Sequence, residues 1–586
     1  MRIFWRLAWF IKDEWKAYVL GILALLGVAL MGLIPPVMIG RFANLLATHQ
    51  LNWQNIWPII GFIAFATIGQ YFLRFGWSYF IWGTAARLEK TLRERLFRHY
   101  LAMDAPFFQK HRTGDLLAHA TNDISQMQRV AGNAVLQMFD AVITGLSVII
   151  AMVWFVNGEM TFWAVLPLFG ITLVATVLGR HIHSAFMKAQ EAFSTLNNKT
   201  QESIMGIKAL KTLGQAREDI QDFSHQVDDT IAANRRAQFF DSLFDPSITI
   251  LIGVSYVVTI ILGGTNVMTG KMNIGQLITF VTYLSQLIWP FMGLGFMFNN
   301  FQRGNASYDR IESLMAEQSA IKDDTAGVNQ VPVGDLDIAI TQFQYPEADE
   351  VVLHDIDVHL PAGQVLGIVG AVGAGKTTLL RLLLREFDNY TGYITVGGID
   401  IRHYRLNKYL PTIGYVPQDN FLFSTTVREN IRFSDPTLTD EQVERAARWA
   451  GLHDDILQLP AGYDTQVGEQ GISLSGGQRQ RLAIARALII NPEILILDDA
   501  LSAVDAKTEK TILETLHTQR AGKTTLIATH RLSSVVNAYE TIVLAEGAIT
   551  ERGTHPALLA ANGWYASMYA AQQIEAKLDE EVAHHG

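Results

Sequence analysis

The stretch VLGIVGAVGAGKTTLLRLLL, residues 365–384, decides the fold of the second half of the chain. It passes from a β-branched strand through the spacing Gly-x-x-x-x-Gly-Lys-Thr into a leucine-rich helix. Such a loop lets backbone N–H groups surround phosphate oxygens at the start of a helix. We therefore expect Lys376 to neutralise the β- and γ-phosphates of a nucleotide and the Thr377 hydroxyl to contact Mg²⁺. The other residues predicted to hold the nucleotide here are Gly370, Gly373, Gly375 and Thr378.

A second stretch, PEILILDDALSAVD at residues 492–505, ends an apolar strand in two adjacent carboxylates, Asp498 and Asp499. A buried strand that ends in an acid downstream of a phosphate loop is the Walker B arrangement. We expect Asp498 to share the Mg²⁺ shell with Thr377. We expect Asp499 to orient or deprotonate the attacking water.

A third stretch, LSGGQRQRLAIARAL at residues 474–488, lies between these two. Ser475 offers a hydroxyl, and Gly476 and Gly477 offer unobstructed N–H groups, at the start of a predicted helix. This makes a second anion site, which one nucleotide does not need. We therefore expect it to serve a nucleotide that is held by another copy or by a partner.

Apolar stretches dominate the first half of the chain. The chain has 49% hydrophobic residues and a mean hydropathy of +0.18. Its 17% charged residues fall below the roughly 25% typical of soluble proteins. Six stretches have the length of a membrane span. They cover residues 17–39, 57–82, 136–156, 160–179, 245–265 and 274–298. The sequence thus predicts a polytopic α-helical membrane domain with six spans in the lipid bilayer, followed by a soluble α/β domain.

Cations set the predicted orientation of these spans. The connections at about 84–134 and 180–240 are long and rich in Lys and Arg, whereas the opposite loops are short. The positive-inside rule places both connections and both termini in the cytoplasm. We expect each connection to be two spans that continue as helices, joined by a transverse segment near Gly114–Gln126 or near Leu213–Asp222.

Composition also bounds the chemistry and the domains. The formal net charge of −10 argues against a nucleic-acid partner, and the lack of cysteine excludes disulfides and thiolate zinc sites. Tryptophans among cations near the N-terminus suit a helix in the membrane interface, although the polar end of the first span fits as well. The predicted parts are an interfacial helix at 1–15, a membrane domain at 16–315, a linker at 316–335, a nucleotide-binding domain at 336–572 with a largely parallel sheet, and an acidic tail at 573–586.

The phosphate loop, LSGGQ and LILDD, preceded by six spans, resemble the ATP-binding-cassette (ABC) family, in particular its exporter half-transporters. The resemblance covers nearly the whole chain. It implies ATP and Mg²⁺ as ligands and two cassettes that sandwich two ATP molecules. Cassette closure would move the spans from inward-facing to outward-facing, with the transverse segments as coupling helices. The signature residues that would contact the partner-held ATP are Ser475, Gly476, Gly477 and Gln478.

The same resemblance implies roles for further motifs. Tyr345 in FQYP would stack on adenine, and Gln418 in YVPQD would link Mg²⁺ to the membrane domain. His530 in ATHR would contact the γ-phosphate, and VGEQG at 467–471 precedes the signature as in exporters. The SAVD loop, from Ser502 to Asp505, would contact the opposite nucleotide site.

Asp499 departs from the family, in which most members carry glutamate. Aspartate is shorter by one methylene, about 1.5 Å, and misplacing a reacting group by ~1 Å costs about a hundredfold in rate. This chain therefore resembles the subunit with the degenerate Walker B acid in heterodimeric bacterial multidrug exporters, in which the partner supplies the working glutamate. A homodimer in which aspartate is adequate stays open. The resemblance implies a bacterial inner or plasma membrane location, with the nucleotide-binding domain in the cytoplasm.

Polar and aromatic residues within the spans are candidates for a substrate cavity. Asp140 would suit hydrophobic cations, and Tyr283, Trp289 and Phe296 would line an adaptable wall. The alternatives are a helix-end or interhelical pair for the acid and a lipid-facing position for the aromatics. We expect ATP-driven export of hydrophobic or amphipathic small molecules. A homodimeric lipid flippase, with Arg74 as a weak headgroup candidate, and an ATP-gated channel or regulator remain alternatives.

Overall fold

The computed structural model describes residues 2–323, 327–346, 348–468 and 474–585, and the side chains of 294–299 and 576–585 lie outside its described part. Packing divides the chain into two units, each of which is described by itself. The first unit is Met1–Leu101 with Thr113–Glu317, and the second is Ala102–Arg112 with Gln318–Gly586. A short piece of the first long connection therefore folds with the second unit.

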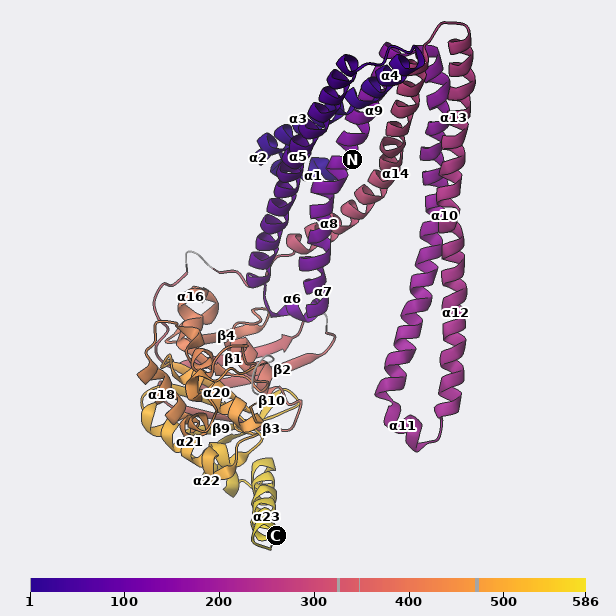
Figure 1. Ribbon diagram of the computed structural model, residues 1–586. Helices are drawn as coiled ribbons and strands as arrows, with labels where there is room; N and C mark the ends of the chain where they lie inside the picture. Colours follow the sequence, from indigo (N-terminus) through magenta and orange to yellow (C-terminus); the bar gives the residue numbers. More distant parts are fainter. Residues whose placement is uncertain (1, 324–326, 347, 469–473, 586) are drawn as a thin grey trace. The chain divides into compact units, whose positions relative to one another are not determined.

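The first unit is helical throughout its described residues (Figure 1). Its helices are α1 (Arg2–Arg6), α2 (Ala8–Asp13), α3 (Trp15–Gly32), α4 (Ile34–Ala47), α5 (Trp53–Leu101), α7 (Thr113–Ala118), the π-helical η1 (His119–Asp123), α8 (Ile124–Arg129), the π-helical η2 (Val130–Ala134), α9 (Val135–Phe155), α10 (Gly158–Met205), α11 (Ile207–Thr212), α12 (Ala216–Ser242), α13 (Phe244–Met268) and α14 (Ile274–Ala316).

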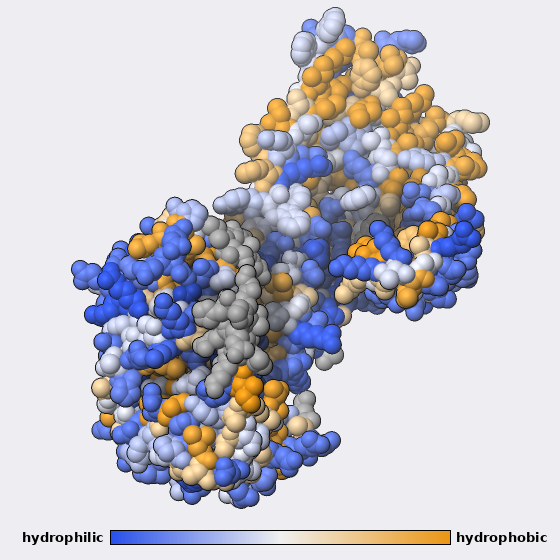
Figure 2. Space-filling model, turned by 90° about the horizontal axis from the view of Figure 1, so that it is seen from below, coloured by the Kyte–Doolittle hydropathy of each residue, from blue (hydrophilic) through white to orange (hydrophobic). Residues whose placement is uncertain are grey.

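Five helical segments in the described part of the chain are long and apolar enough to cross a membrane. These segments are Trp15–Ala47, Trp53–Leu101, Thr113–Phe155, Gly158–Met205 and Ala216–Met268. They contain the first five predicted spans, and the sixth falls in α14. In Figure 2 apolar side chains gather over much of the first unit, as expected for a surface that faces lipid.

The long connections are helical extensions of the spans, as the sequence predicts. α10 lies beside α12 and α13 as a long antiparallel pair (Figure 1). The predicted transverse segments were misplaced, however. Gly114–Gln126 belongs to the helical run that continues into α9, and the short helix of that connection is α6 (Ala105–Lys110). In the second connection the short helix is α11, which ends just before the predicted segment at Leu213–Asp222.

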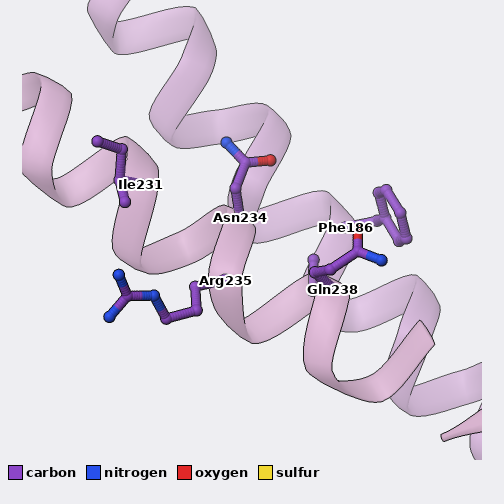
Figure 3. A pocket seen from close by; sticks show the side chains of 6 residues that line it. Phe186, Ile231, Asn234, Arg235 and Gln238 are labelled. Atoms are coloured by element: carbon purple, nitrogen blue, oxygen red, sulfur yellow. The ribbon is translucent and has the colours of Figure 1, made fainter. Parts of the chain in front are cut away.

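A hollow of about 350 Å³ lies between α10 and α12 (Figure 3). Phe186 of α10 faces it, and Ile231, Asn234, Arg235 and Gln238 line it from α12. The hollow has one cation among apolar and amide groups.

The first span is broken at Leu33, between α3 and α4. Pro36 has no N–H to donate to the Gly32 carbonyl, four residues earlier. Polar side chains of α14 bind the carbonyls at this break. Gln286 Nε2 donates to Gly32 O at 3.2 Å, Tyr283 Oη to Leu33 O at 2.8 Å and Thr279 Oγ1 to Pro36 O at 3.2 Å. Pro35 and Pro36 therefore divide the helical segment that contains the first predicted span.

The second unit contains two sheets. One has four strands in the order β2-β1-β4-β5 and is antiparallel; the other has six in the order β10-β9-β3-β8-β7-β6 and is parallel except for β10. The parallel sheet confirms the predicted α/β domain, whereas the antiparallel sheet was not foreseen. The strands are β1 (Leu336–Gln344), β2 (Val351–Leu360), β3 (Val365–Gly370), β4 (Thr391–Val396), β5 (Ile399–Asp400), β6 (Ile413–Val416), β7 (Ile494–Asp498), β8 (Thr524–Ala528), β9 (Glu540–Ala545) and β10 (Ala548–Gly553).

Helices flank these sheets and carry the predicted motifs. β3, β7 and β8 are buried along their length, so their carboxyl ends place side chains at one edge of the parallel sheet. The helices are α6, α15 (Lys376–Leu383), η3 (Ile401–His403), α16 (Leu406–Tyr409), η4 (Leu410–Thr412), α17 (Val427–Ile431), η5 (Arg432–Ser434), α18 (Asp440–Trp449), α19 (His453–Leu457), η6 (Gly462–Asp464), α20 (Gly476–Leu488), α21 (Ala506–Gln519), η7 (Leu532–Val535), α22 (His555–Ala560) and α23 (Trp564–His585).

Candidate nucleotide site

The phosphate loop connects β3 to α15, as the sequence predicts. Gly370 has φ 151°, and a Cβ on it would lie 2.2 Å from the Leu544 carbonyl oxygen. Gly375 has φ 99° and forms the N-cap of α15. Gly373 has φ 81° and open space around its Cα. Only glycine fits the closest of these positions without a shift of the backbone, and the loop leaves a cradle at the start of a helix.

Lys376 lies folded over this loop. Its Nζ donates to the carbonyl oxygens of Gly370 and Ala371, each at 2.9 Å. Burial lowers the pKa of the ammonium, while Asp499 and Asp498 raise it. The ammonium is thus held in the loop where a phosphate would lie.

Asp498 ends β7 and is only 3% exposed. Thr377 Oγ1 donates to its Oδ1 at 3.1 Å, and Tyr415 Oη donates to its Oδ2 at 3.4 Å. Burial raises the pKa of Asp498, and the neighbouring Asp499 raises it further against these two donors. A hydroxyl beside a buried carboxylate is a donor set that fits Mg²⁺. When bound, Mg²⁺ would supply the positive charge that this carboxylate and the phosphates require.

Asp499 follows in a left-handed conformation, with φ 49°, which aspartate tolerates better than most residues. Its backbone is held at both ends. The Asp499 N–H donates to Ala528 O at 2.8 Å, and Ser502 Oγ donates to Asp499 O at 2.9 Å. The position from which this carboxylate projects is therefore fixed by β8 on one side and by the 502–505 loop on the other.

His530 lies just beyond the carboxyl end of β8. Burial lowers the pKa of its imidazole, and the Lys376 ammonium lowers it further, against the raising effect of Asp499 and Asp498. The ring is therefore neutral at pH 7 and interacts with the same charges that surround the phosphate loop. The pairing of β8 with β3, Ala528 opposite Ile368, brings His530 to the edge of the sheet that carries the phosphate loop, and its contact with the γ-phosphate stays a prediction.

Tyr345 and Gln418 lie on the flanks of the loop. The Tyr345 ring meets Phe343 and Phe387 edge-on, at centroid distances of 5.0 and 5.1 Å, and its hydroxyl forms a 2.9 Å hydrogen bond with Thr378 Oγ1. A hollow of about 300 Å³ adjoins Tyr345. Gln418 is exposed just past β6. Tyr345 is thus anchored to α15 with space beside it.

The signature residues start α20. Ser475 Oγ accepts from the Gln478 N–H at 3.2 Å, and Gln478 Oε1 accepts from the Ser475 N–H at 3.0 Å. Ser475 and Gly476 are exposed, so this helix start is open to a ligand from outside the chain. The last three residues of VGEQG, 469–471, lie outside the described part of the chain.

The 502–505 loop lies against the start of α20. A Cβ on Gly477 would lie 2.8 Å from the Ala503 carbonyl oxygen, so glycine permits this approach. Asp505 forms the N-cap of α21 and accepts from the Thr508 N–H at 3.0 Å, and this bond lowers the pKa of the carboxyl. The signature residues and the 502–505 loop, both predicted to contact the ATP held by the partner, therefore lie next to each other.

Sequence reasoning missed three residues at this site: Tyr415, Gln480 and Arg531. Gln480 Oε1 accepts from the Ala503 N–H at 2.9 Å, and Arg531 Nη2 donates to Ser502 O at 2.8 Å. Each stands within or beside a quoted motif, YVPQD, LSGGQRQ or ATHR, and that adjacency was the available signal.

The cavity candidates are not brought together. Tyr283 is fully buried and bonded to Leu33, so it belongs to the core of the first unit and the expectation that it lines a cavity is wrong in this structure. Trp289 is 66% exposed, and Asp140 accepts from Thr144 Oγ1 at 2.9 Å on its own helix. The side chain of Phe296 lies outside the described residues.

Two family models match the chain: "ABC transporter transmembrane region" over residues 18–291 and "ABC transporter" over residues 353–502. The multidrug resistance-like ATP-binding protein MdlA of Escherichia coli is 40% identical, covering 99% of this chain and 98% of its own. The probable multidrug resistance ABC transporter ATP-binding/permease protein YheI of Bacillus subtilis is 38% identical, covering 97% of both chains. The solved structure of a bacterial Atm1-family ABC exporter with ATP bound matches with a TM-score of 0.77 and 25% identity, over 95% of this chain and 98% of that chain.

Proposed function

Because the chain belongs to the ABC transporter family and carries the membrane region and the ATPase domain on one polypeptide, we propose that it exports hydrophobic or amphipathic small molecules as one half of a heterodimer. The family assignment makes it an ATP-hydrolysing transporter of the exporter type. ABC exporters work as dimers on membrane-embedded substrates. The relatives whose names include multidrug resistance support the substrate class.

The fixed backbone of Asp499 is the observation that best supports the proposed heterodimer. A side chain one methylene short reaches the position of a glutamate carboxylate only if its backbone advances by about 1.5 Å. The bonds from Asp499 N–H to Ala528 O and from Ser502 Oγ to Asp499 O hold that backbone in place. The site on this chain's own phosphate loop therefore binds ATP and hydrolyses it slowly, since in-line attack requires close placement of the water.

The proposed heterodimer has a second ATP site, on the partner's phosphate loop, which hydrolyses ATP faster and is called the fast site here. This chain contributes the exposed start of α20 to that site. Ser475, Gly476, Gly477 and Gln478 would contact the ATP held by the partner, whose glutamate would activate water there. On this chain, Lys376 and Thr377 would bind and orient the phosphates, and Asp498 would hold Mg²⁺. Neutral His530 would donate a hydrogen bond to the γ-phosphate. The Tyr345 ring would stack on adenine. Gln418 would contact Mg²⁺ and link it to the membrane domain.

The proposed location follows from the family and from the charge pattern. The chain would cross a bacterial cell membrane six times, with the nucleotide-binding domain and both termini in the cytoplasm. The linker at 316–335 would join the two domains, residues 1–15 would lie in the interface, and residues 573–586 would form the tail.

Steady-state ATPase activity of the purified chain in lipid tests the degenerate site. We expect low activity for the chain alone, a rise of about tenfold or more with Asp499→Glu if two copies associate, and none with Lys376→Ala. If neither wild type nor Asp499→Glu turns over until the partner half is added, the heterodimer is supported directly. Substantial wild-type activity that Asp499→Glu does not raise would overturn the proposal.

Transport tests the substrate class separately. Inside-out vesicles that contain the chain with its partner should accumulate ethidium, a lipophilic cation, only with ATP, and Lys376→Ala should serve as the control. ATP-driven movement of a fluorescent phospholipid without ethidium accumulation would instead support a flippase.

A further inference from the structure

Arg531 binds the 502–505 loop through several carbonyl groups at once. Its Nη2 donates to Ser502 O at 2.8 Å, and its Nη1 donates to Val504 O at 2.9 Å. The same Nη1 lies 3.4 Å from Leu501 O. A planar guanidinium with five donors can hold such a turn, whereas a lysine ammonium meets fewer carbonyls.

A buried acid fixes the guanidinium. Glu509 is 4% exposed, and its Oε2 accepts from Arg531 Nη1 at 3.0 Å. Its Oε1 accepts from the hydroxyls of Ser533 and Ser534. Because removing one partner leaves a buried charge unpaired, Arg531 and Glu509 hold each other in place. The loop carbonyls are therefore bound to a rigid group.

Gln480 of α20 holds the loop from another side. Its Nε2 donates to Ser502 Oγ at 3.0 Å, and its Oε1 accepts from the Ala503 N–H. The helix that begins with Ser475 and the loop from 502 to 505 are thus tied together. A displacement of the loop would be transmitted to the signature helix.

Arg531 is joined by one peptide bond to His530. The Thr529 N–H donates to Ile368 O at 3.1 Å and Ala528 pairs with Ile368, so His530 lies beside the strand that leads into the phosphate loop of its own chain. The next residue, Arg531, binds the 502–505 loop, which leads into α21. Two consecutive side chains therefore connect the two functional surfaces of one domain.

We propose that Arg531 is a positioning residue that couples nucleotide binding at Lys376 and His530 to the placement of the 502–505 loop and the start of α20. The assignment of those two segments to the partner-held ATP rests on the proposed function, but the coupling within this chain does not. A nucleotide that shifts His530 would shift the Arg531 backbone and, through its guanidinium, the loop.

The absence of cysteine gives a direct test. Ala503 is exposed, so an Ala503→Cys variant of the full chain in lipid carries one thiol on the loop. We measure its rate of labelling by fluorescein maleimide with and without Mg-ATP. We expect ATP to change the rate by about fivefold or more, the lower range of coupling between sites. Lys376→Ala in the same chain should abolish the change.

Arg531→Met, added to the Ala503→Cys chain, should remove most of the ATP effect on thiol labelling while the affinity for fluorescent MANT-ATP stays within about twofold. Arg531→Lys keeps the charge beside Glu509 and should retain part of the effect, which keeps the test valid if the methionine variant fails to fold. The matched control is Arg402→Met, because Arg402 also pairs with an acid, Asp400, and donates to a carbonyl, Gly392 O at 2.8 Å.

No response of the loop thiol to ATP, an unchanged response in Arg531→Met, or an equal loss in Arg402→Met would each overturn the proposal. A purely structural role would alter the basal labelling rate and leave the ATP dependence intact. If the heterodimer proposal is wrong, the chain alone will show ATPase activity. The thiol-labelling measurement does not depend on that result.

Discussion

Thr377 and Tyr415 approach the two oxygens of Asp498 from different elements, α15 and β6. Both hydroxyls stabilise the carboxylate, whereas burial and Asp499 favour the protonated acid. The charge of Asp498 at a given pH is therefore set by a balance between its burial and these donors. Because Mg²⁺ binds the carboxylate form, that balance controls metal binding as well.

Tyr415→Phe should shift the pH dependence of Mg²⁺ binding upward. Removing a donor to the carboxylate raises the pKa of Asp498 further, so that protons compete with Mg²⁺ at a higher pH. We expect the pH of half-maximal Mg²⁺-dependent MANT-ATP binding to rise by about half a unit, since a weak hydrogen bond contributes less than the ~1.4 kcal/mol of a full unit. Mg²⁺ titrations between roughly pH 5 and pH 8 measure this.

Tyr393→Phe is the control for this shift, because Tyr393 is a half-exposed tyrosine on β4. Identical pH profiles for wild type and Tyr415→Phe would show that the hydroxyl does not act on Asp498.

Local sequence order predicted Lys376 and Thr377 because a strand, a glycine loop and a helix follow one another directly, and it predicted Asp498 because this acid ends an apolar strand. Tyr415 stands in the quoted motif YVPQD, but its contact with Asp498 could not be found from local order. Its hydroxyl reaches Asp498 because β6 pairs with β7 in parallel register, Tyr415 opposite Ile496, although the two strands are far apart in the chain. Arg531 and Gln480 were missed for the same reason, since their partners lie in a loop whose course depends on tertiary packing.

At the scale of elements, the break between α3 and α4 shows how an interrupted span keeps its carbonyls bonded. In a membrane, unpaired backbone groups are costly, and neighbouring helices must supply the missing donors. Gln286 of α14 does so for the Gly32 carbonyl, and Tyr283 and Thr279 add donors to the Leu33 and Pro36 carbonyls; the three residues lie on one face at helical spacing. The two prolines stand within the predicted first span, but neither the break nor the partner helix was predicted from local spacing.

Tyr283→Phe should destabilise the first unit without creating a cavity. The Leu33 carbonyl would lose its side-chain donor from α14, at a cost of about 1–2 kcal/mol for a hydrogen bond between membrane helices. We expect a lower midpoint of thermal unfolding for the full chain in lipid or detergent. The control is Tyr79→Phe, since Tyr79 is 68% exposed on α5. Equal midpoints for both variants would exclude a stabilising role for the Tyr283 hydroxyl.

The short helix α6 was missed although its start is written in the sequence. Asp104 caps it, accepting from the Phe107 N–H at 3.2 Å, and Pro106 occupies its first turn. An acid followed closely by proline is a known helix start signal. The prediction instead placed the segment near Gly114–Gln126, where Gly114 lies inside the helix that begins at Thr113.

At the scale of the whole molecule, three peptide bonds join the two units: Leu101 to Ala102, Arg112 to Thr113 and Glu317 to Gln318. Within the second unit, the Asp104 carboxylate accepts from Ser319 Oγ at 3.0 Å and from the Ala320 N–H at 2.5 Å. Ala105 packs against the core formed by β1, β2 and β3. α6 is therefore held to the linker and to the ATPase domain.

Asp104→Ala should release the linker. The variant loses the cap of α6 and both bonds to the linker, and loss of a cap alone costs about 1 kcal/mol, or about fivefold in the population of the open form. We expect trypsin to cleave after Lys322, which is exposed in the linker, at least about fivefold faster in the full chain.

Asp115→Ala controls for the loss of an exposed acid near the same connection. Unchanged cleavage in Asp104→Ala would show that the side chain does not restrain the linker.

The assignment of residues 102–112 to the second unit also limits how such proteins can exchange parts during evolution. A recombination event at the linker would replace the ATPase domain but keep residues 102–112 of the original chain. Those eleven residues pack on the original ATPase domain, so they would not match the new one. Functional chimaeras of this chain therefore need two exchanges, one at 102–112 and one after Glu317. Because the chain passes from the first unit into the second and back at residues 102–112, the two units are expected to be inherited together.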